Sequence, residues 1–394
     1  MQHIFKLVLA GFVLFFGGCP ANAHDISLLK LGRTLFEDQS LSNPPGQSCA
    51  SCHLSKRAFS GDGVVAKGAD PAKSGTRNVP TLMYSAFSPR FSFVAEKNEK
   101  GEVEQTPTGG QFWDGRANSL NDQMLGPLLN PLEMANKDIA SVAEKLSHSP
   151  SRKAFEQRFG AVGGQSPEGI VANMARAIAA YERSVAFSPF SSKFDDVLRG
   201  RDHFNVQEVL GFALFKDPEK GNCLGCHVGD VKSQKPGDWL FTDFTYDNLG
   251  LPRNMAIPAN ADSSHRDLGL CQRDDIAKIV PPGVTPQSLC GAFKVPTLRN
   301  VAVTSPYFRN GVFSDLREAV QFYVTRDTNP EKWYPKSADG AVRKFSDLNE
   351  ADAANVNTSE VPYDRKPGEA PRLNDAEIDA LVAFLHTLTD RQTK

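Results

Sequence analysis

Two copies of the five-residue pattern C-x-x-C-H constrain this chain more than any other feature of its sequence. Two thiols separated by a short turn can add to the two vinyl groups of one porphyrin, and the adjoining histidine supplies an axial nitrogen to the iron. The pattern therefore predicts two covalently bound haem c groups, one attached through Cys49, Cys52 and His53 and the other through Cys223, Cys226 and His227.

Half of a zinc site is the main alternative for either copy. A structural zinc ion needs four converging ligands, and no second cysteine pair or histidine pair lies close in sequence to either copy. A chance match is also much harder to sustain for two copies than for one. The sequence therefore favours two haem groups over zinc.

Residues 1–23 are interpreted as a secretory signal peptide. Lys6 gives a positive start, Leu7–Phe16 is an unbroken apolar stretch, and Ala21–Ala23 reads as a small-x-small cleavage site before His24. The apolar stretch is too short to cross a bilayer, so no transmembrane span is expected.

Export to the periplasm agrees with the haem prediction, because haem c is attached outside the bacterial cytoplasm. Lipid anchoring at Cys19 is less favoured, since Phe16–Cys19 is a poor lipobox.

Of seven cysteines, four lie in the haem motifs and Cys19 leaves with the signal peptide. Cys271 and Cys290 remain, and an oxidising compartment favours a disulfide between them, although the sequence alone does not prove it.

The charge balance argues against a nucleic-acid partner. The 44 Lys and Arg residues are nearly matched by 46 Asp and Glu residues. A chain that binds nucleic acid generally carries a marked excess of basic residues, which this one lacks.

An internal duplication surrounds the two haem motifs. Leu31–Asp38 precedes the first motif and Leu210–Asp217 precedes the second, with similar sequences and apolar residues at helical spacing. Each copy is also followed by a candidate closing helix. The first is predicted over 166–181, and the second over 374–388, where Asn374 and Glu377 form a capping box.

These patterns predict an all-α protein made of two cytochrome c-like haem domains with long ordered loops. We expect the first domain over residues 24–195 and the second over 196–394. The longest insertion, 57–130, is rich in Gly, Pro and Ser but also carries several aromatic residues, which argues against disorder.

The chain resembles the bacterial di-haem cytochrome c peroxidases and their MauG-like relatives. The resemblance covers essentially the whole mature chain. Besides the haem motifs, it rests on Phe112–Ala117, Gly126–Met134, Lys294–Asn300 and Pro306–Gly311.

This resemblance implies roles for residues at the first haem, which would be the peroxide-reacting one. Gln123 and Glu133 would lie on its distal side, with Glu133 as general acid and base. Trp113 would relay electrons between the haems. The plainer alternatives are a solvated surface carboxylate for Glu133 and core packing for Trp113.

The resemblance also implies a calcium site between the domains. Asn78 and the backbone carbonyls of Thr304 and Pro306 match its ligands. Ligation by oxygen alone suits a hard cation such as Ca²⁺.

Tyr323 is the most informative position of the second domain. Asp315 suits the start of a helix on which Tyr323 shares a face with Leu316, Ala319 and Val320. The resemblance implies that this position holds the sixth ligand of the second haem. Ordinary peroxidases of the family carry Met there, whereas MauG-like members carry Tyr. A methionine ligand raises the haem potential, whereas a phenolate should stabilise oxidised iron. A tyrosine that only packs in the core is the alternative.

Two departures from the family pattern matter. No histidine lies between His53 and His148, where typical peroxidases keep one that closes the resting peroxide site, so an open first haem is expected. Gly221 and Asn222 stand where MauG carries a tryptophan that passes oxidising equivalents to its protein substrate. The natural target therefore need not be methylamine dehydrogenase.

The leading hypothesis is a periplasmic MauG-like enzyme that reacts with hydrogen peroxide and shares the oxidising equivalents between two haems. Its partner would be a protein substrate or a small redox protein. One rival is a conventional cytochrome c peroxidase that takes electrons from a small cytochrome or cupredoxin. The other is a non-enzymatic di-haem electron carrier. The remaining histidines, His148, His203, His265 and His386, are interpreted as surface or edge residues.

Overall fold

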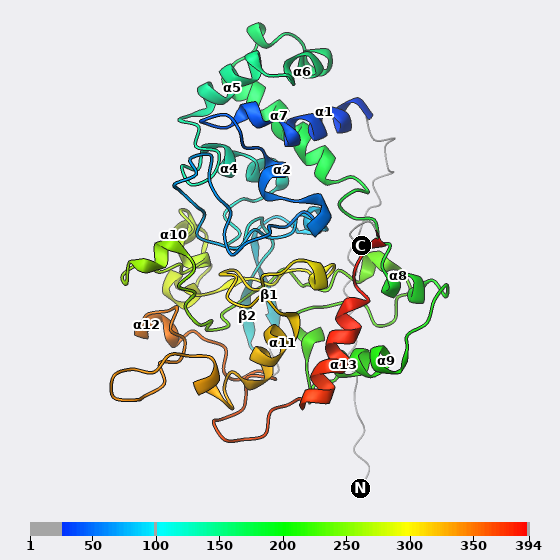
Figure 1. The fold of residues 1–394 in the computed structure, drawn as a ribbon, viewed down its shortest axis with the longest axis vertical. Helices are drawn as coiled ribbons and strands as arrows, with labels where there is room; N and C mark the ends of the chain where they lie inside the picture. Colours follow the sequence, from blue (N-terminus) through cyan, green and yellow to red (C-terminus); the bar gives the residue numbers. More distant parts are fainter. Residues whose placement is uncertain (1–25, 98–100, 392–394) are drawn as a thin grey trace.

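The computed structural model describes residues 26–97 and 101–391, and these are largely helical (Figure 1). The predicted signal peptide and Cys19 lie outside the described residues. Short 3-10 helices and long ordered loops connect the α-helices of the described chain, which are α1 Ile26–Glu37, α2 Cys49–Cys52, α3 Leu120–Gln123, α4 Leu125–Leu129, α5 Ile139–His148, α6 Arg152–Phe159, α7 Pro167–Glu182, α8 Lys193–Leu198, α9 Val206–Lys216, α10 Ile276–Ile279, α11 Leu316–Thr325, α12 Glu350–Ala353 and α13 Asp375–His386.

The N-terminal half is built on the crossing of α1 and α7, seen at one end of the molecule in Figure 1. Ser166 caps α7 and Pro167 is its first residue, as predicted. Gly32 allows a very close approach, because a Cβ at this position would lie 2.9 Å from the Cβ of Tyr181 and closer still to the carbonyl of Ala177. This helix pair forms the first hydrophobic core.

The C-terminal half repeats this arrangement with α9 and α13. The predicted capping box is confirmed, with Asn374 as the N-cap and Glu377 bonded back to it. Here the glycine is Gly211, and a Cβ on it would lie 2.8 Å from the Cβ of Phe384 and meet the carbonyl of Ala380. The duplication in the sequence is therefore a duplication in helix packing.

The structure also contains two small antiparallel sheets that the helical prediction missed. One pairs β1 (Ser92–Lys97) with β2 (Val103–Thr108), and the other pairs β3 (Tyr246–Asp247) with β4 (Phe293–Lys294). Phe93 pairs with Pro107 in the first sheet. A proline opposite a strand residue weakens the sequence signal for a strand, since proline cannot donate to the ladder.

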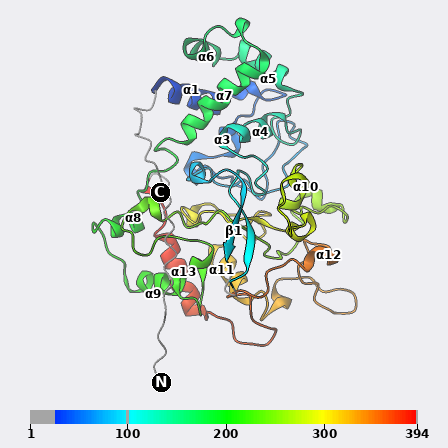
Figure 2. The same ribbon diagram turned by 180° about the vertical axis from the view of Figure 1, so that it is seen from behind.

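The β1–β2 hairpin runs from the N-terminal half onto the C-terminal half (Figure 2). At its base, the Gly109 amide donates to the Phe244 carbonyl at 2.9 Å, and the Tyr246 hydroxyl donates to the Gly109 carbonyl at 2.7 Å. Phe91 and Phe93 pack with Tyr246 in a third small core. The two halves therefore interlock through this insertion.

The predicted domain boundary, between residues 195 and 196, falls inside α8. Phe194 packs in the core of the C-terminal half. Asp195 forms a two-pronged ion pair with Arg299, with N–O distances of 2.9 and 3.1 Å, and both side chains are fully buried. The C-terminal core thus begins at α8, and the two-domain division itself stays a prediction.

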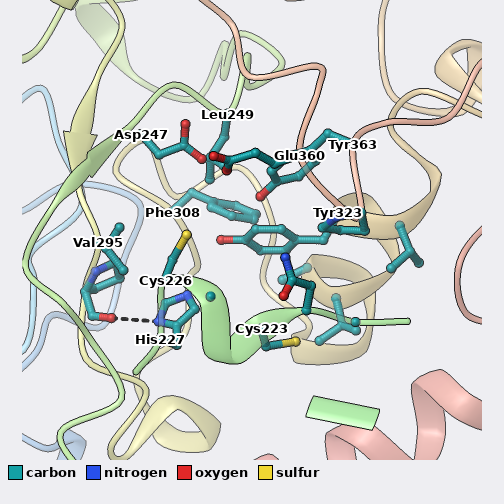
Figure 3. A pocket seen from close by; sticks show the side chains of 18 of the residues that line it. Cys223, Cys226, His227, Asp247, Leu249, Val295, Phe308, Tyr323, Glu360 and Tyr363 are labelled. Atoms are coloured by element: carbon teal, nitrogen blue, oxygen red, sulfur yellow. Dashed lines mark hydrogen bonds between the residues drawn. The ribbon is translucent and has the colours of Figure 1, made fainter. Parts of the chain in front are cut away.

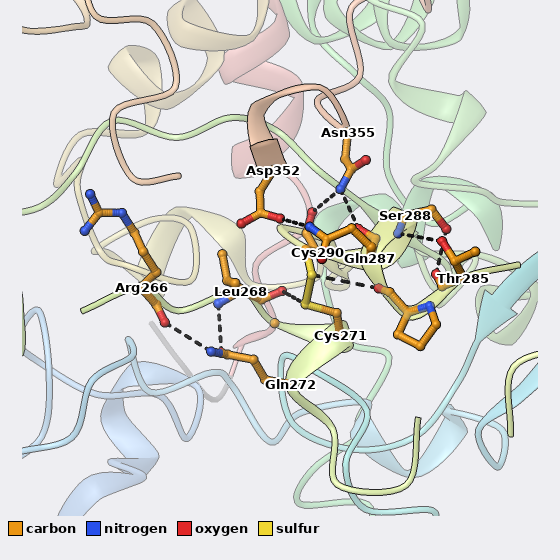
Figure 4. The surroundings of a disulfide bond; sticks show 12 residues. Arg266, Leu268, Cys271, Gln272, Thr285, Gln287, Ser288, Cys290, Asp352 and Asn355 are labelled. Carbon is orange, nitrogen blue, oxygen red and sulfur yellow. Dashed lines mark hydrogen bonds between the residues drawn. A yellow bond between two sulfur atoms is a disulfide. The ribbon is translucent and has the colours of Figure 1, made fainter. Parts of the chain in front are cut away.

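The disulfide between Cys271 and Cys290 is confirmed (Figure 4). It joins two loops whose ends lie near the short helix α12. The Asn355 side chain donates to the Cys290 carbonyl at 3.2 Å, and Gln287 bonds to Asp352. No helix among the described residues is both long and apolar enough to span a bilayer.

The close crossing of α9 and α13 generates a stability prediction. Gly211→Ala should lower the free energy of unfolding by about 1–3 kcal/mol, because the added methyl group forces the two helices apart. Urea unfolding of the holoprotein, followed by circular dichroism, measures this loss. Gly237→Ala is the matched control, since its Cβ would meet nothing within 4 Å. Equal stability of the two variants would contradict the packing argument.

Candidate functional site

The first C-x-x-C-H motif forms the short helix α2, and His53 follows it directly. The His53 amide donates to the Cys49 carbonyl at 2.9 Å, which closes the turn. The Nδ1 atom of His53 lies 2.9 Å from the Phe59 carbonyl oxygen. Because a carbonyl only accepts, Nδ1 carries the proton and Nε2 keeps its lone pair. Burial lowers the pKa of His53 to about 4, so the ring is neutral.

The second motif repeats this geometry. The His227 amide donates to the Cys223 carbonyl at 2.8 Å. Its Nδ1 lies 3.0 Å from the Phe241 carbonyl oxygen and 3.1 Å from that of Pro296. Burial lowers the pKa of His227 to about 4. A backbone acceptor on one ring nitrogen is the usual support for a histidine that binds a metal through the other.

The four motif thiols fit covalent haem attachment. All four are unpaired within the described chain, where Cys271 and Cys290 form the disulfide. Cys223, Cys226 and His227 line one cavity, and Cys52 and His53 line another, with Cys49 one helical turn before His53. The set of donors matches what a haem c group requires: two sulfur atoms for its vinyl groups and one nitrogen for its iron.

Two cavities lie beside the two motifs and share a wall. The cavity at His53 has a volume of about 500 Å³, and the one at His227 about 1080 Å³. Both are large enough for a small-molecule cofactor. The residues that line both cavities are Trp113, Lys294, Val295, Pro296, Leu298, Val301, Tyr307 and Phe308.

Gln123 and Glu133 both line the first cavity together with His53. Asn130 donates to an oxygen of Glu133 at 2.7 Å, which fixes the carboxyl. Burial raises the pKa of Glu133, while Arg116 and the Asn130 hydrogen bond oppose the increase. Glu133 is therefore a held, partly desolvated carboxyl rather than a solvated surface group. Among the described residues that line this cavity, His53 is the only histidine.

Tyr323 lies on α11 and points into the second cavity, where its hydroxyl faces the same space as His227 (Figure 3). Asp315 caps α11 by accepting from the Glu318 amide at 2.9 Å, as predicted. Burial raises the pKa of Tyr323 well above its usual value. A phenol in this position would ionise only beside a strong positive charge such as a metal ion.

Trp113 is held in the wall between the cavities by two backbone contacts. Its indole N–H donates to the Asn78 carbonyl at 2.9 Å, and its own carbonyl accepts from the Lys294 amide at 2.8 Å. Burial lowers the pKa of Lys294 to about 8, and its ammonium group donates to the Gly110 carbonyl at 2.6 Å. The structure thus brings Trp113 beside both cavities.

The three residues matched to a calcium site all line the first cavity. The Asn78 amide nitrogen donates to the carbonyls of Pro306, at 2.5 Å, and Phe308, at 3.2 Å. A cation bound here requires the Asn78 amide to turn its oxygen inward. No group of three acidic, cysteine or histidine side chains suited to a metal occurs in the described chain. The ligands expected here are the Asn78 amide oxygen and the backbone carbonyls of Thr304 and Pro306.

Some residues of the site were not predicted from the sequence. The carbonyls of Phe59 and Phe241 that orient the histidines carry no side-chain signal. Asp247 and Glu360 face the second cavity side by side, and burial together with Glu360 raises the pKa of Asp247 to about 6 (Figure 3). Tyr363 lines this cavity as well and stacks on Tyr323 with ring centroids 6.0 Å apart. The residues that line neither cavity include His148, His203, His265 and His386.

Known proteins similar to this chain were found by sequence and by structure. The profile of a family described as di-haem cytochrome c peroxidase matches residues 27–203. The methylamine utilization protein MauG of Paracoccus denitrificans is 39% identical over 388 residues, which cover 94% of this chain and 91% of MauG. The cytochrome c peroxidase Ccp of Escherichia coli is 31% identical over 310 residues, 78% of this chain and 55% of Ccp.

A solved structure agrees with these relatives. The diheme peroxidase BthA of Burkholderia thailandensis matches with a TM-score of 0.85 and 40% identity, covering 94% of this chain and 87% of BthA. The helix pairs, the two haem motifs and these similarities agree with one another. The chain belongs to the di-haem cytochrome c peroxidase family, and it is a haem-dependent oxidoreductase of the MauG-like kind.

Proposed function

We propose that this protein is a periplasmic MauG-like enzyme that reacts with hydrogen peroxide and shares the oxidising equivalents between two covalently bound haem c groups. His53 and His227 would be their proximal ligands, one in each of two cytochrome c-like domains. The observation that carries the proposal is the placement of Tyr323, whose hydroxyl points into the second cavity, which His227 also lines.

At the first site, the protein's own residues would manage the proton of peroxide. When bound, the first haem supplies the iron at which the O–O bond of peroxide is cleaved. Glu133 takes a proton from one peroxide oxygen and returns it to the departing oxygen, which leaves as water. Gln123 donates a hydrogen bond that orients the peroxide. The hydrogen bond from Asn130 and the burial of Glu133 support these roles.

Between the sites, Trp113 would carry electrons. Its side chain lines both cavities, so one aromatic group spans the wall that separates them. The hydrogen bond from its indole N–H to Asn78 keeps the ring in one orientation. A relay residue benefits from such fixing, because electron transfer is sensitive to distance and little reorganisation is then needed.

At the second site, Tyr323 would be the sixth ligand. An anionic oxygen offsets the charge of the iron in a low-dielectric cavity and so favours its oxidised states. The Tyr323 hydroxyl has no hydrogen-bond partner among the described residues, which leaves it available to a metal. This ligand separates a MauG-like enzyme from a conventional peroxidase with methionine.

A conventional cytochrome c peroxidase is the second candidate, supported by the 31% identity to Ccp of Escherichia coli. In that case a small cytochrome or cupredoxin would supply electrons. Family membership speaks against a non-enzymatic carrier. A protein substrate is the partner that fits the MauG-like proposal, and Gly221 and Asn222 imply a route to it that differs from MauG.

A calcium ion held by Asn78, Thr304 and Pro306 would belong to the same proposal. The convergence of these groups beside Trp113 supports it, because the Asn78 carbonyl also holds the indole. The ion would then stabilise the relay. Metal analysis of the purified protein that finds no calcium would count against this site.

Replacement of Glu133 tests the proton-transfer role. Glu133→Gln should slow the reaction with peroxide by about 10²-fold or more, the scale of a lost acid–base group. The wild-type rate should fall as pH is lowered through the raised pKa of Glu133, and this dependence should be absent in the variant. Stopped-flow absorbance measures both rates. Glu144→Gln, in the exposed part of α5, is the matched control, and equal rates in the two variants would remove Glu133 from catalysis.

Replacement of Tyr323 tests the ligand. Tyr323→Met should raise the potential of the second haem and shorten the lifetime of the peroxide-generated state by about tenfold or more, since a charged interaction worth more than ~1.4 kcal/mol is lost. Tyr323→Phe should lose the ligand while keeping the packing. Redox titration and absorption spectra follow both.

Tyr363→Phe is the control for these variants, since Tyr363 lines the same cavity and stacks on Tyr323. It should leave the spectrum of the second haem unchanged. If Tyr323→Phe also leaves that spectrum and potential unchanged, Tyr323 only packs in the core, and the conventional peroxidase becomes the better proposal.

A further inference from the structure

Glu182 is a buried carboxyl that the proposed chemistry does not use. It is the last residue of α7, and only 3% of it is exposed. Its Oε2 atom is buried and has no hydrogen-bond partner, and the same holds for the Ser184 hydroxyl two residues later. Burying a carboxyl oxygen without a hydrogen-bond partner destabilises a fold. We therefore looked for a function that would account for Glu182 at this position.

The place of Glu182 follows from the duplicated helix pairs. Gly32 faces Ala177 and Tyr181 in the first pair, and Gly211 faces Ala380 and Phe384 in the second. Tyr181 therefore corresponds to Phe384, and the next residue along each helix makes Glu182 correspond to Leu385. The second half supplies an internal reference for the position of this carboxyl.

Leu385 shows what this position faces. It lines the second cavity beside the attachment cysteine Cys223, together with Phe215 and Leu381. In the first half, burial raises the pKa of the Cys49 thiol to about 12, and the nearby Glu182 carboxyl adds to this increase. Glu182 thus lies near the attachment cysteine Cys49, whereas the corresponding position of the second half holds a leucine that lines the cavity together with Cys223.

The surroundings of Glu182 keep it uncharged at rest. Burial raises its pKa to about 8, and Arg183, next along α7, opposes this increase. On α2 the neighbouring titratable group is the Cys49 thiol, which becomes a thioether once haem is attached. On α1 the exposed pair Arg33 and Glu37 acts on Tyr181 instead. A positive charge that develops nearby would favour the ionised carboxyl.

We propose that Glu182 is a charge-compensating residue of the first site, which loses its proton when the first haem is oxidised and regains it on reduction. The inference rests on the proposed pair of haems. In each cycle one electron leaves for an electrode or for peroxide, one proton leaves Glu182 for solvent, and the carboxylate remains near Cys49. Leu385 cannot do this, so the coupling through Glu182 would have no counterpart at the same position of the second half, where Asp247 and Glu360 are the carboxyls that face the cavity.

Midpoint potentials measured against pH test this proposal. Spectroelectrochemical titration of the holoprotein should give a first-haem potential that falls as pH rises through neutrality. The pH dependence of the second haem, whose cavity is lined by Asp247 and Glu360, should be the same in the wild type and in the Glu182 variants. Glu182→Gln and Glu182→Leu should both flatten the pH dependence of the first haem. An unchanged pH dependence in both variants, or none in the wild type, would overturn the proposal.

The duplicated position offers the reverse experiment. Leu385→Glu places a carboxyl beside the second haem and should increase the pH dependence of its potential. If this variant does not fold, the pair of Glu182 variants decides. These potentials require no reaction with peroxide. A protein that shows the pH dependence but is inert to peroxide would refute the proposed function and leave this inference standing.

Stability against pH gives an independent readout. The carboxyl titrates near 4.5 when unfolded and near 8 when folded, so folding favours its protonated form. This contribution is fully present below pH 4.5 and is lost as pH rises through 8. The free energy of unfolding of the wild type should therefore fall relative to Glu182→Gln over this range in urea titrations. A constant difference would show that Glu182 is not a buried, titrating group.

Discussion

Each half of the molecule depends on the close approach of a helix backbone to a glycine. Gly32 admits the carbonyl of Ala177, and Gly211 admits that of Ala380. Each crossing fixes the closing helix against the helix that leads into a C-x-x-C-H motif. The same kind of helix contact therefore positions the helices around both cavities. A bulkier residue at either glycine would open the space that has to enclose a prosthetic group.

The second constraint is the wall that the two cavities share. The segment around Pro296 contributes to both cavities, and the Pro296 carbonyl also accepts from His227. Arg299, at the end of the same segment, is anchored by its buried ion pair with Asp195. One stretch of chain thus orients the His227 ring and separates the two cavities.

Much of the architecture could be predicted from the sequence because it depends on local chemistry. The capping box of Asn374, the start of α7 and the pairing of Cys271 with Cys290 are encoded by residue type and spacing. The hairpin of β1 and β2 was missed, since Pro107 breaks the strand pattern and the hairpin is supported by distant contacts with Phe244 and Tyr246. Contacts across such distances leave no periodic signal.

The site divides in the same way. The haem motifs and the position of Tyr323 followed from spacing and resemblance, but the carbonyls that orient the histidines did not. Backbone acceptors carry no residue identity, and Phe59 and Phe241 reach them only through the fold. Glu182 looks like an ordinary helix residue in the sequence. Its burial and its correspondence with Leu385 depend on how the duplicated helices pack.

The electron paramagnetic resonance spectrum of the diferric holoprotein, before and after one equivalent of hydrogen peroxide, tests the central claim most directly. The account predicts one high-spin and one low-spin ferric signal, from the open first site and the Tyr323-ligated second site. Both signals should disappear together on addition of peroxide and return slowly, since the two sites share the oxidising equivalents. Two low-spin signals that peroxide leaves unchanged would contradict it.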